Sequence, residues 1–395
     1  MKSVFPKPVF VYADVRSPIG KFGGSLKRFT APQLAGLTLK ECILRAEKSG
    51  FSKSEIDFVF MGHARQAGAG PNPARQATIG AGLSEKIPAI TINQACASGL
   101  ASVIAAIEKI SVGKANHVFA GGVESMSNTP YLLPQARWGQ KMGHLPVVDG
   151  MHQDGFFCPM SQMVMGMTVE TFLAKELKIS RQEQDEYALS SQKKADSAWS
   201  AGLFKDEVFG IPAEGKNPGL ETDEHRRGDS KLEDLTKLTP VFDSKSGSVT
   251  AGNSSGITDG SAFVLVSSKQ THNCSAEIID YEITALDPRK MGLGPVVATQ
   301  NLLKRQGLKV EDLEAVELNE AFAAQVIACN RELKIPIEKL NPRGGAIALG
   351  HPIGATGTRI LVSLMNTLKG KPGALGLATL CVSGGMGVTI LVARK

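Results

Sequence analysis

Hydrophobic positions along the chain follow two periods, which predict strands that lead into helices. The run IPAITI (87–92) is short, apolar and rich in β-branched residues, as a buried strand is. Beyond it, apolar residues recur at the spacing of one helix face: Leu100, Val103, Ile104 and Ile107. We therefore expect a strand followed directly by a helix that buries this stripe.

The same order returns near the C-terminus. There AIAL (346–349) takes the place of the apolar run, and the next helix carries a matching stripe: Ile360, Leu361, Leu364 and Leu368. Upstream, residues 50–64 match residues 307–321 without a gap in their order of glycine, apolar and acidic positions. The chain therefore contains two copies of one unit. Its alternating strands and helices predict α/β halves on largely parallel sheets.

Each copy closes with a strand and a glycine-rich step, HVFAGGVES at 117–125 and LATLCVSGGMG at 377–387. The chain between the copies, 125–249, has a different pattern. It is rich in methionine at first, then charged and helical over 179–199, then polar. Such an insert is too irregular for a third core, so we expect it to cover a site formed by the two halves.

Composition restricts the possible functions. The 395 residues are 42% hydrophobic and 21% charged, and no long uncharged apolar run could span a bilayer. The N-terminal segment lacks the apolar block of a signal peptide, and Asp14 argues against a transit peptide, so we expect a cytoplasmic protein. The net charge of +6 is mild and does not indicate nucleic acid, but it suits an anionic ligand such as a nucleotide-bearing coenzyme.

The six cysteines are scattered without a CxxC pair, which argues against a zinc ribbon or a disulfide framework. We expect free thiols in a reducing compartment. One of them, Cys96, lies where the strand 87–92 gives way to a helix, close to unpaired N–H groups and the positive end of the helix dipole. This environment lowers a thiol pKa and favours a nucleophilic thiolate, although a cysteine among Ala and Gly is more often simply packed.

Three further residues occupy positions suited to catalysis, each with a structural alternative. His351 lies in a glycine-rich stretch that allows close approach to a ligand; it is an acid/base candidate or a histidine bonded to turn backbone. Cys381 ends a buried strand before SGGMG, whose N–H groups suit an oxyanion, or it fills a tight strand end. Asn319, in ELNEAF, stands where a strand meets a helix, and such an asparagine is usually a helix cap.

Taken together and in this order, the segments resemble the thiolase family over essentially the whole chain. The blocks that carry the resemblance are QAGAGPNPARQ (66–76), NQACASG (93–99), MGMTVE (165–170), ISRQEQDEYALSSQ (179–192), TAGNSSGITDG (250–260), ELNEAF (317–322), NPRGGAIALGHPIGATG (341–357) and CVSGGMG (381–387). The resemblance implies the thiolase fold, an α/β fold with two homologous halves in a five-layered αβαβα arrangement. The N-terminal half would be 1–124 plus 250–271, the loop domain over the active site 125–249, and the C-terminal half 272–395.

The resemblance also implies a reaction, the thiolytic cleavage of a 3-ketoacyl-CoA or the reverse Claisen condensation of acetyl-CoA. Cys96 would hold the acyl group, His351 would help to ionise it, and Cys381 would protonate the α-carbon. One oxyanion would be met by His351 and a water held by Asn319, and the other by the backbone N–H groups of Cys96 and Ser383. Coenzyme A is then a substrate, and we expect neither a metal nor a prosthetic group.

Positions that bind coenzyme A follow from the same resemblance. Ser255 matches the serine that meets the pantetheine amide, and Arg227 matches an arginine near the adenine nucleotide. Met165 matches a residue of the acyl pocket. The apolar walls of the tunnel match Phe242, Ala251, Met291, Ala321 and Phe322. The alternatives are a solvated loop charge for Arg227 and simple packing for Met165.

The sequence departs from the family pattern at two positions. Ser383 stands where glycine is usual and places a hydroxymethyl group beside the acyl chain. Val164 stands where short-chain acetoacetyl thiolases carry a histidine. Both changes bear on the preferred acyl group, and the second weakens the case for a strict acetoacetyl specificity.

Two other functions are weighed against this one. The first is a β-ketoacyl synthase-like enzyme that acts on carrier-protein thioesters, against which Cys381 argues. The second is a non-catalytic acyl-CoA or lipid carrier on the same scaffold, against which the presence of all four candidate catalytic residues argues. By resemblance we also expect a homodimer or homotetramer, because residues 66–76 resemble a segment at the dimer interface of thiolases.

Overall fold

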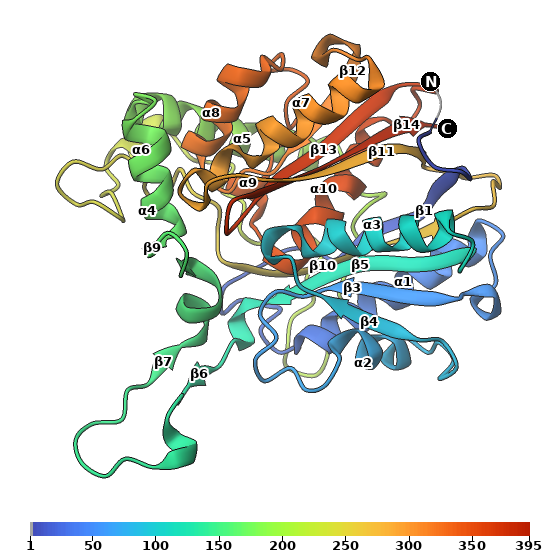
Figure 1. Ribbon diagram of the computed structural model, residues 1–395, viewed down its shortest axis with the longest axis horizontal. Coiled ribbons are helices and arrows are strands. Elements are labelled where there is room, and N and C mark those ends of the chain that lie inside the picture. The colour runs from blue at the N-terminus through green and yellow to red at the C-terminus, as the bar shows by residue number, and fades with distance from the viewer. Residues whose placement is uncertain (1–2) are drawn as a thin grey trace.

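The computed structural model describes residues 3–395, whose elements form two similar halves (Figure 1). The strands of the first half are β1 (Val9–Arg16), β2 (Gly20–Lys21), β3 (Phe58–Gly62), β4 (Ala89–Ile92), β5 (His117–Ser125) and β10 (Thr258–Ser267). Those of the second half are β11 (Ala276–Ala285), β12 (Leu313–Leu318), β13 (Leu375–Val382) and β14 (Met386–Arg394). One sheet joins them in the order β12-β13-β14-β11-β1-β10-β5-β3-β4, with β2 beside β10.

The strand order shows the duplication directly. β3 runs parallel to β5 as β12 runs parallel to β13, and in both halves antiparallel strands follow. The halves meet where β1 pairs with β11 through residues 9–11. Among the strands of residues 3–395, only the β3–β4, β3–β5 and β12–β13 pairs are parallel, so the expectation of largely parallel sheets was wrong. A tight turn joins β13 and β14 in an antiparallel hairpin. The pairs β1–β10, β1–β11, β5–β10 and β11–β14 are antiparallel too, although long stretches of chain separate their strands.

Helices complete the layers. They are α1 (Ala31–Lys48), α2 (Pro73–Gly80), α3 (Ser98–Ser111), α7 (Gly294–Gln306), α8 (Ala323–Leu333) and α10 (Ile353–Thr367). α1 and α2 lie on the outer face of the first half, α7 and α8 lie on the outer face of the second, and α3 and α10 lie side by side between them (Figure 1). This is the five-layered αβαβα arrangement that the resemblance implied.

The central layer forms because both of its helices bury the apolar stripes seen in the sequence. Leu100 and Ile107 of α3 lie in one buried cluster with Ile360 and Leu364 of α10 and with strands from both halves. Burial of this kind stabilises a fold by roughly 1.5–3 kcal/mol for each large aliphatic side chain. Burial of the two stripes therefore stabilises the contact between the halves as well as the helices α3 and α10 themselves.

Two glycines allow this layer to close. A Cβ on Gly99 of α3 would lie 2.9 Å from the carbonyl oxygen of Gly354 in α10, and one on Gly122 of β5 would lie 2.0 Å from the same oxygen. A side chain at either position would push the start of α10 away. The contact fixes the start of α3 against the start of α10, and Cys96 and His351 lie just before those two starts.

The insert consists of a projecting arm and a helical part. Its elements are β6 (Tyr131–Leu132), β7 (Val148–Asp149), β8 (Phe157–Cys158), β9 (Met163–Val164), α4 (Met165–Val169), α5 (Arg181–Ser200) and α6 (Leu232–Thr236). β6 and β7 pair in an arm that projects from the body (Figure 1). The charged run 179–199 forms α5 as expected, with Ser180 as its N-cap. None of the helices in residues 3–395 combines the length and the apolar character that crossing a membrane needs.

One element differs from its counterpart in the other half. AIAL forms a helical turn, α9 (Ala346–Leu349), so the second half has no strand equivalent to β4. The Ile347 N–H donates to the buried carboxylate of Glu320 at 3.1 Å, and its carbonyl accepts from Gln192 of α5 at 3.2 Å. These bonds to side chains replace the ladder bonds of a strand, and they attach the insert to the second half.

Candidate active site

A cavity of ≈ 490 Å³ is lined by residues of both halves and of the insert. Four of the predicted catalytic and oxyanion residues line it: Cys96, His351, Cys381 and Ser383. All of the residues matched to coenzyme A positions line it too: Met165, Arg227, Phe242, Ala251, Ser255, Met291, Ala321 and Phe322. Asn319 does not reach its wall. Two sulfur atoms from different halves of the chain therefore face one space.

The local sequence places Cys96 in a sharp turn. Ala95 has a φ of 47°, in the left-handed region that residues with a Cβ rarely adopt. The Asn93 side chain accepts from the Ala95 N–H at 3.0 Å, and the Ser98 hydroxyl accepts from the Gln94 N–H at 2.9 Å. Such strain costs roughly 1–3 kcal/mol and persists only where surrounding contacts impose it, which is common at functional sites.

The charge state of Cys96 differs from the sequence expectation. Burial raises the pKa of its thiol, while the backbone N–H groups of Ser383 and Cys96 and the charge of Arg65 act in the opposite direction. The sequence argument for a lowered pKa considered dipoles and N–H groups and omitted desolvation, which is the larger effect. Cys96 therefore rests as a thiol and needs a base to ionise it.

His351 has the properties of that base. Burial, together with the charges of Arg359 and Arg65, lowers the pKa of its imidazole to about 3, so the ring is neutral. Its Nδ1 lies 2.7 Å from the Thr356 hydroxyl, which donates to the Pro352 carbonyl at 3.0 Å. Because that hydroxyl has a single proton, this hydrogen-bond network assigns the ring proton to Nδ1. Nε2 is left as the acceptor.

Cys381 is the second-last residue of β13, close to the turn into β14. Gly384 and Gly385 adopt φ angles of 89° and 82°, and a Cβ on Gly385 would lie 2.3 Å from the Leu286 carbonyl oxygen, so only glycine fits the turn. Burial raises the pKa of the Cys381 thiol well above its ordinary value, and the nearby Cys96 raises it further. The thiol is therefore protonated and able to donate.

Asn319 is buried but does not cap a helix. α8 begins at Ala323, and no side chain caps it. Neither polar atom of the Asn319 amide has a hydrogen-bond partner in the part of the chain that the structure describes. A buried amide of this kind requires a partner from solvent or ligand. The helix-cap interpretation was wrong, and the amide has the capacity to hold a water molecule.

Glu124 is a residue that sequence reasoning missed. Its carboxylate accepts from the N–H groups of Ala64 and Arg65 at 3.2 Å each and of Gly354 at 3.0 Å, and it lies 3.2 Å from His63 Nε2. It thereby links the loop after β3 in the first half with the start of α10 in the second. The available signal was a carboxylate inside a largely apolar, buried strand, because such a group must be paired.

A second cavity of ≈ 190 Å³ adjoins the first, and the two share Cys96, Met165 and Ser383 among their walls. Residues 153–155 and 157–160 of the insert complete it together with Arg65, which sequence reasoning also missed. The larger cavity contains a further missed residue, His225. Burial and the charge of Arg227 lower the pKa of its imidazole to about 4.

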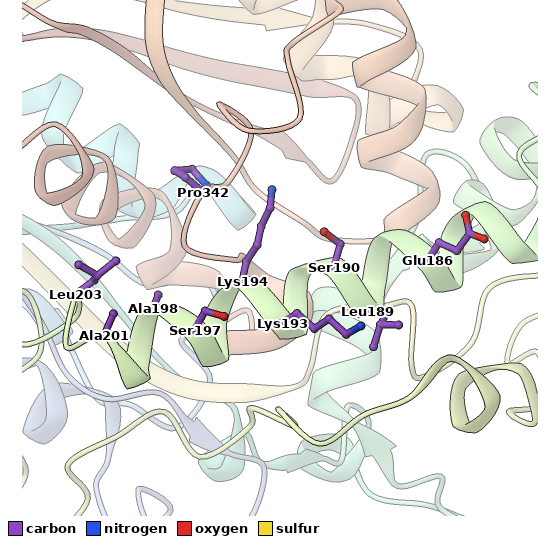
Figure 2. A pocket seen from close by; sticks show the side chains of 10 residues that line it. All are labelled: Glu186, Leu189, Ser190, Lys193, Lys194, Ser197, Ala198, Ala201, Leu203 and Pro342. Carbon is purple, nitrogen blue, oxygen red and sulfur yellow. The ribbon is translucent and has the colours of Figure 1, made fainter.

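A third hollow of ≈ 570 Å³ follows α5 and holds none of the predicted site residues (Figure 2). Its lysine nearest to Pro342 is Lys194, whose Nζ donates to the carbonyls of Ile337 and Leu340 at 2.9 Å each. That side chain attaches α5 to the loop before Pro342, so its role is structural. Within residues 3–395, no group of three or more His, Cys, Asp or Glu side chains could hold a metal ion.

Comparisons with known proteins match the whole chain. Residues 9–270 match the family model described as thiolase, N-terminal domain, and residues 272–394 match thiolase, C-terminal domain. The acetyl-CoA acetyltransferase of Cupriavidus necator is 43% identical over 395 residues, which cover 98% of this chain and 99% of the relative. A probable acetyl-CoA acyltransferase of Staphylococcus aureus is 44% identical with the same coverage. The crystal structure of human mitochondrial 3-ketoacyl-CoA thiolase superposes with a TM-score of 0.93 at 38% identity, covering 98% of this chain and 99% of that one.

Proposed function

Because the chain belongs to the thiolase family, we propose that it transfers acyl groups between coenzyme A thioesters through an acyl-Cys96 intermediate. It is an acyl-CoA C-acyltransferase, and its reaction is the thiolytic cleavage of a 3-ketoacyl-CoA or the reverse condensation. The observation that supports the proposed intermediate is the single cavity lined by Cys96, Cys381 and His351. The carrier-protein enzyme and the non-catalytic carrier are not favoured, since the relatives are named for coenzyme A chemistry.

The first step is ionisation of Cys96. His351 Nε2 takes the thiol proton as the sulfur attacks the keto carbonyl. Both groups are neutral at rest, because burial raises the pKa of the thiol and lowers that of the imidazole. The backbone N–H groups of Cys96 and Ser383 then stabilise one oxyanion, and His351 with a water on Asn319 stabilises the other.

The second step breaks the carbon–carbon bond. The α-carbon leaves as a carbanion and takes the proton of Cys381, which releases acetyl-CoA. The raised pKa of Cys381 keeps that proton in place until the carbanion develops. In the second half-reaction the coenzyme A thiol attacks acyl-Cys96 and gives its proton to Cys381. The departing Cys96 sulfur recovers its own proton from His351.

Coenzyme A itself is proposed to lie in the larger cavity. Its pantetheine would pass Ser255 between the apolar walls named above, and its nucleotide would lie near Arg227, whose side chain is exposed. Met165 borders both cavities, which supports its place beside the acyl group. Besides the water on Asn319, these steps require only coenzyme A and the acyl-CoA.

We also propose the domain division 1–124 plus 250–271, 125–249 and 272–395. The return of β10 to pair with β1 and β5 supports the first part. A homodimer or homotetramer and a cytoplasmic location are further proposals. Exposed apolar side chains on the arm support the first of these, and six free thiols in the described residues support a reducing compartment.

Peptide mapping by mass spectrometry after incubation with acetyl-CoA tests the acyl-Cys96 proposal. We expect an acetyl group on the Cys96 peptide of the wild type and none in Cys96→Ser. A matched control is Cys274→Ser, which removes a thiol that lines neither cavity and should leave the adduct in place. An adduct on another cysteine, or none at all, would remove the basis of the proposed mechanism.

A further inference from the structure

The smaller cavity beside Cys96 contains a buried arginine that acyl transfer alone does not require. The side chain of Arg65 is buried, with the residue 3% exposed, and its three guanidinium nitrogens have no hydrogen-bond partner in residues 3–395. An unpaired charge in such a place is strongly unfavourable, so buried charges are normally paired. Arg65 and Cys96 line this cavity together. The unmatched charge therefore borders a space that Cys96 also borders.

The nearby carboxylates of the protein do not neutralise this guanidinium. Glu124 uses its oxygens on His63 and on three backbone N–H groups. Asp154 lines the same cavity but is exposed to solvent, and no ion pair joins it to Arg65 among the described residues. Desolvation is consequently the largest influence on Arg65 and lowers its pKa, although the charges of Glu124 and Asp154 oppose it.

The insert is shaped to hold the guanidinium in place. Its carbon lies 4.9 Å from the centroid of the Phe156 ring, a cation–π contact. Gly155 allows this approach, because a Cβ there would lie 2.1 Å from Nη2 of Arg65. The N–H groups of the guanidinium are thereby held beside the smaller cavity without a hydrogen-bond partner in residues 3–395.

We propose that the smaller cavity receives an acyl chain that ends in a carboxylate and that Arg65 binds this carboxylate. The inference rests on the proposed acyl-Cys96 intermediate. A guanidinium and a carboxylate match in a two-bonded planar geometry, and such a ligand supplies the negative charge that the protein does not. A chain ending in a methyl group would leave the guanidinium both dry and unpaired.

The size of the cavity limits the length of the chain. Its volume of ≈ 190 Å³ is close to that of the cavity of about 150 Å³ known to hold benzene, so an acyl group of about four to six carbons fits. The substrate class is therefore the coenzyme A thioester of a short 3-oxo-dicarboxylic acid. Ser383, with its hydroxymethyl group, lines the same cavity and adds a polar wall.

The covalent chemistry is unchanged by this ligand. The Cys96 sulfur bonds to the 3-keto carbon, the bond between carbons 2 and 3 breaks, and carbon 2 takes the Cys381 proton and leaves within acetyl-CoA. The part retained on Cys96 is the one that carries the carboxylate. The coenzyme A thiol then gives its proton to Cys381 and releases this part as a dicarboxylic acyl-CoA two carbons shorter.

Two coenzyme A thioesters of equal length test the proposal, 3-oxoadipyl-CoA and 3-oxohexanoyl-CoA, which differ only in a terminal carboxylate or methyl group. We expect the wild type to cleave the first with a kcat/KM at least about tenfold higher, because a site built for a polar group rejects the analogue that lacks it. Arg65→Met, of similar length without the charge, should lower kcat/KM for 3-oxoadipyl-CoA by about 100-fold and abolish the preference. Arg65→Lys should retain part of it.

The control is Arg137→Met, which removes an exposed arginine that lines neither cavity and should keep the wild-type ratio. The proposal would be overturned if the wild type had the higher kcat/KM for 3-oxohexanoyl-CoA. It would also be overturned if the ratio of the two kcat/KM values were the same in the wild type and in Arg65→Met. If Arg65→Met does not fold, the wild-type ratio decides alone. Acetylation of Cys96 by acetyl-CoA separates the two proposals: an adduct without a preference defeats only this one, whereas no adduct defeats the proposed function as well.

Discussion

Burial raises the pKa values of the two thiols in the site and lowers that of the imidazole, and these shifts set the protonation states before the reaction. The thiols of Cys96 and Cys381 keep their protons because desolvation raises their pKa values. The imidazole of His351 stays neutral because desolvation lowers its pKa. In the proposed mechanism, proton transfer from Cys96 to His351 therefore belongs to the reaction and not to the resting enzyme.

Acylation should consequently be insensitive to pH where an ordinary histidine titrates. His351, with a pKa of about 3, stays unprotonated well below the ordinary value of about 6.5. We expect the rate constant for acetylation of Cys96, measured by rapid quench and mass spectrometry, to change less than about threefold between about pH 5.5 and about pH 8. A tenfold fall centred near pH 6.5 would show that His351 titrates normally.

The same lowered pKa has a consequence for stability. The unfolded chain binds a proton at this histidine below about pH 6.5, whereas the folded chain does so only near pH 3. The contribution of neutral His351 to stability is thus fully present above that upper value and declines as the pH falls toward the lower one. Urea unfolding should show a shallower acid decline in His351→Gln than in the wild type; equal declines would be inconsistent with this pKa.

At the scale of elements, the helices that bury a regular stripe of apolar residues were predictable from the sequence. The period of apolar residues fixes α3 and α10, and the charged run fixes α5. AIAL was misread because its backbone bonds go to Glu320 and Gln192, which lie far away in the chain. The pairing of Glu124 depends in the same way on topology that no local pattern contains.

The candidate catalytic residues came from the family resemblance and not from periodicity. Considered alone, the position of Asn319 indicated a helix cap, and the position of Cys96 indicated a lowered pKa. Both readings failed because they counted local backbone groups and left out burial by distant elements. Arg65 had no local signal at all, since its importance lies in the absence of a partner in the folded chain.

Packing at the start of α10 offers a prediction at this scale. Gly122→Ala would place a Cβ 2.0 Å from the Gly354 carbonyl oxygen, and overpacking of this kind costs about 1–3 kcal/mol or more. We expect a lower free energy of unfolding in urea and slower acetylation of Cys96, because His351 moves with the start of α10. Gly80→Ala is the matched control, since a Cβ there meets nothing within 4 Å. Equal losses in both variants would contradict the assigned contact.

At the scale of the whole molecule, the arm of β6 and β7 is a candidate contact between subunits. Trp138 and Met142, between these strands, are 86% and 88% exposed, and Tyr131 and Val147 are 69% and 62% exposed. Single exposed apolar residues are ordinary, but a group of them on a projecting arm marks an interaction surface. The arm therefore supports the larger of the two proposed assemblies, a homotetramer.

Light scattering coupled to size exclusion tests this assembly. We expect the wild type to be a tetramer and the double variant Trp138→Ser with Met142→Ser to be a dimer, because residues 66–76, the expected dimer contact, are unchanged. Val112→Ser removes an apolar residue that is 71% exposed outside the arm and should leave the tetramer intact. An unchanged mass in the double variant would exclude the arm as the contact.

The duplicated fold explains why neither half suffices for the reaction. In the proposed mechanism the first half supplies Cys96 and the second supplies His351 and Cys381, which line one cavity with residues of the insert, while Asn319 is buried outside its wall. The glycine contacts and the Glu124 carboxylate hold the two halves in the register that brings these groups together. The central claim is that two thiols meet in one cavity and perform different steps.

The most direct test of that claim is the exchange of the α-protons of acetyl-CoA with deuterium from the solvent, compared between the wild type and Cys381→Ala. We expect exchange in the wild type. In the variant we expect an acetyl-Cys96 adduct to form while exchange slows by about 100-fold or more, since the proton-transfer group is missing. Exchange at the wild-type rate in Cys381→Ala, with the adduct present, would contradict the assignment of proton transfer to Cys381.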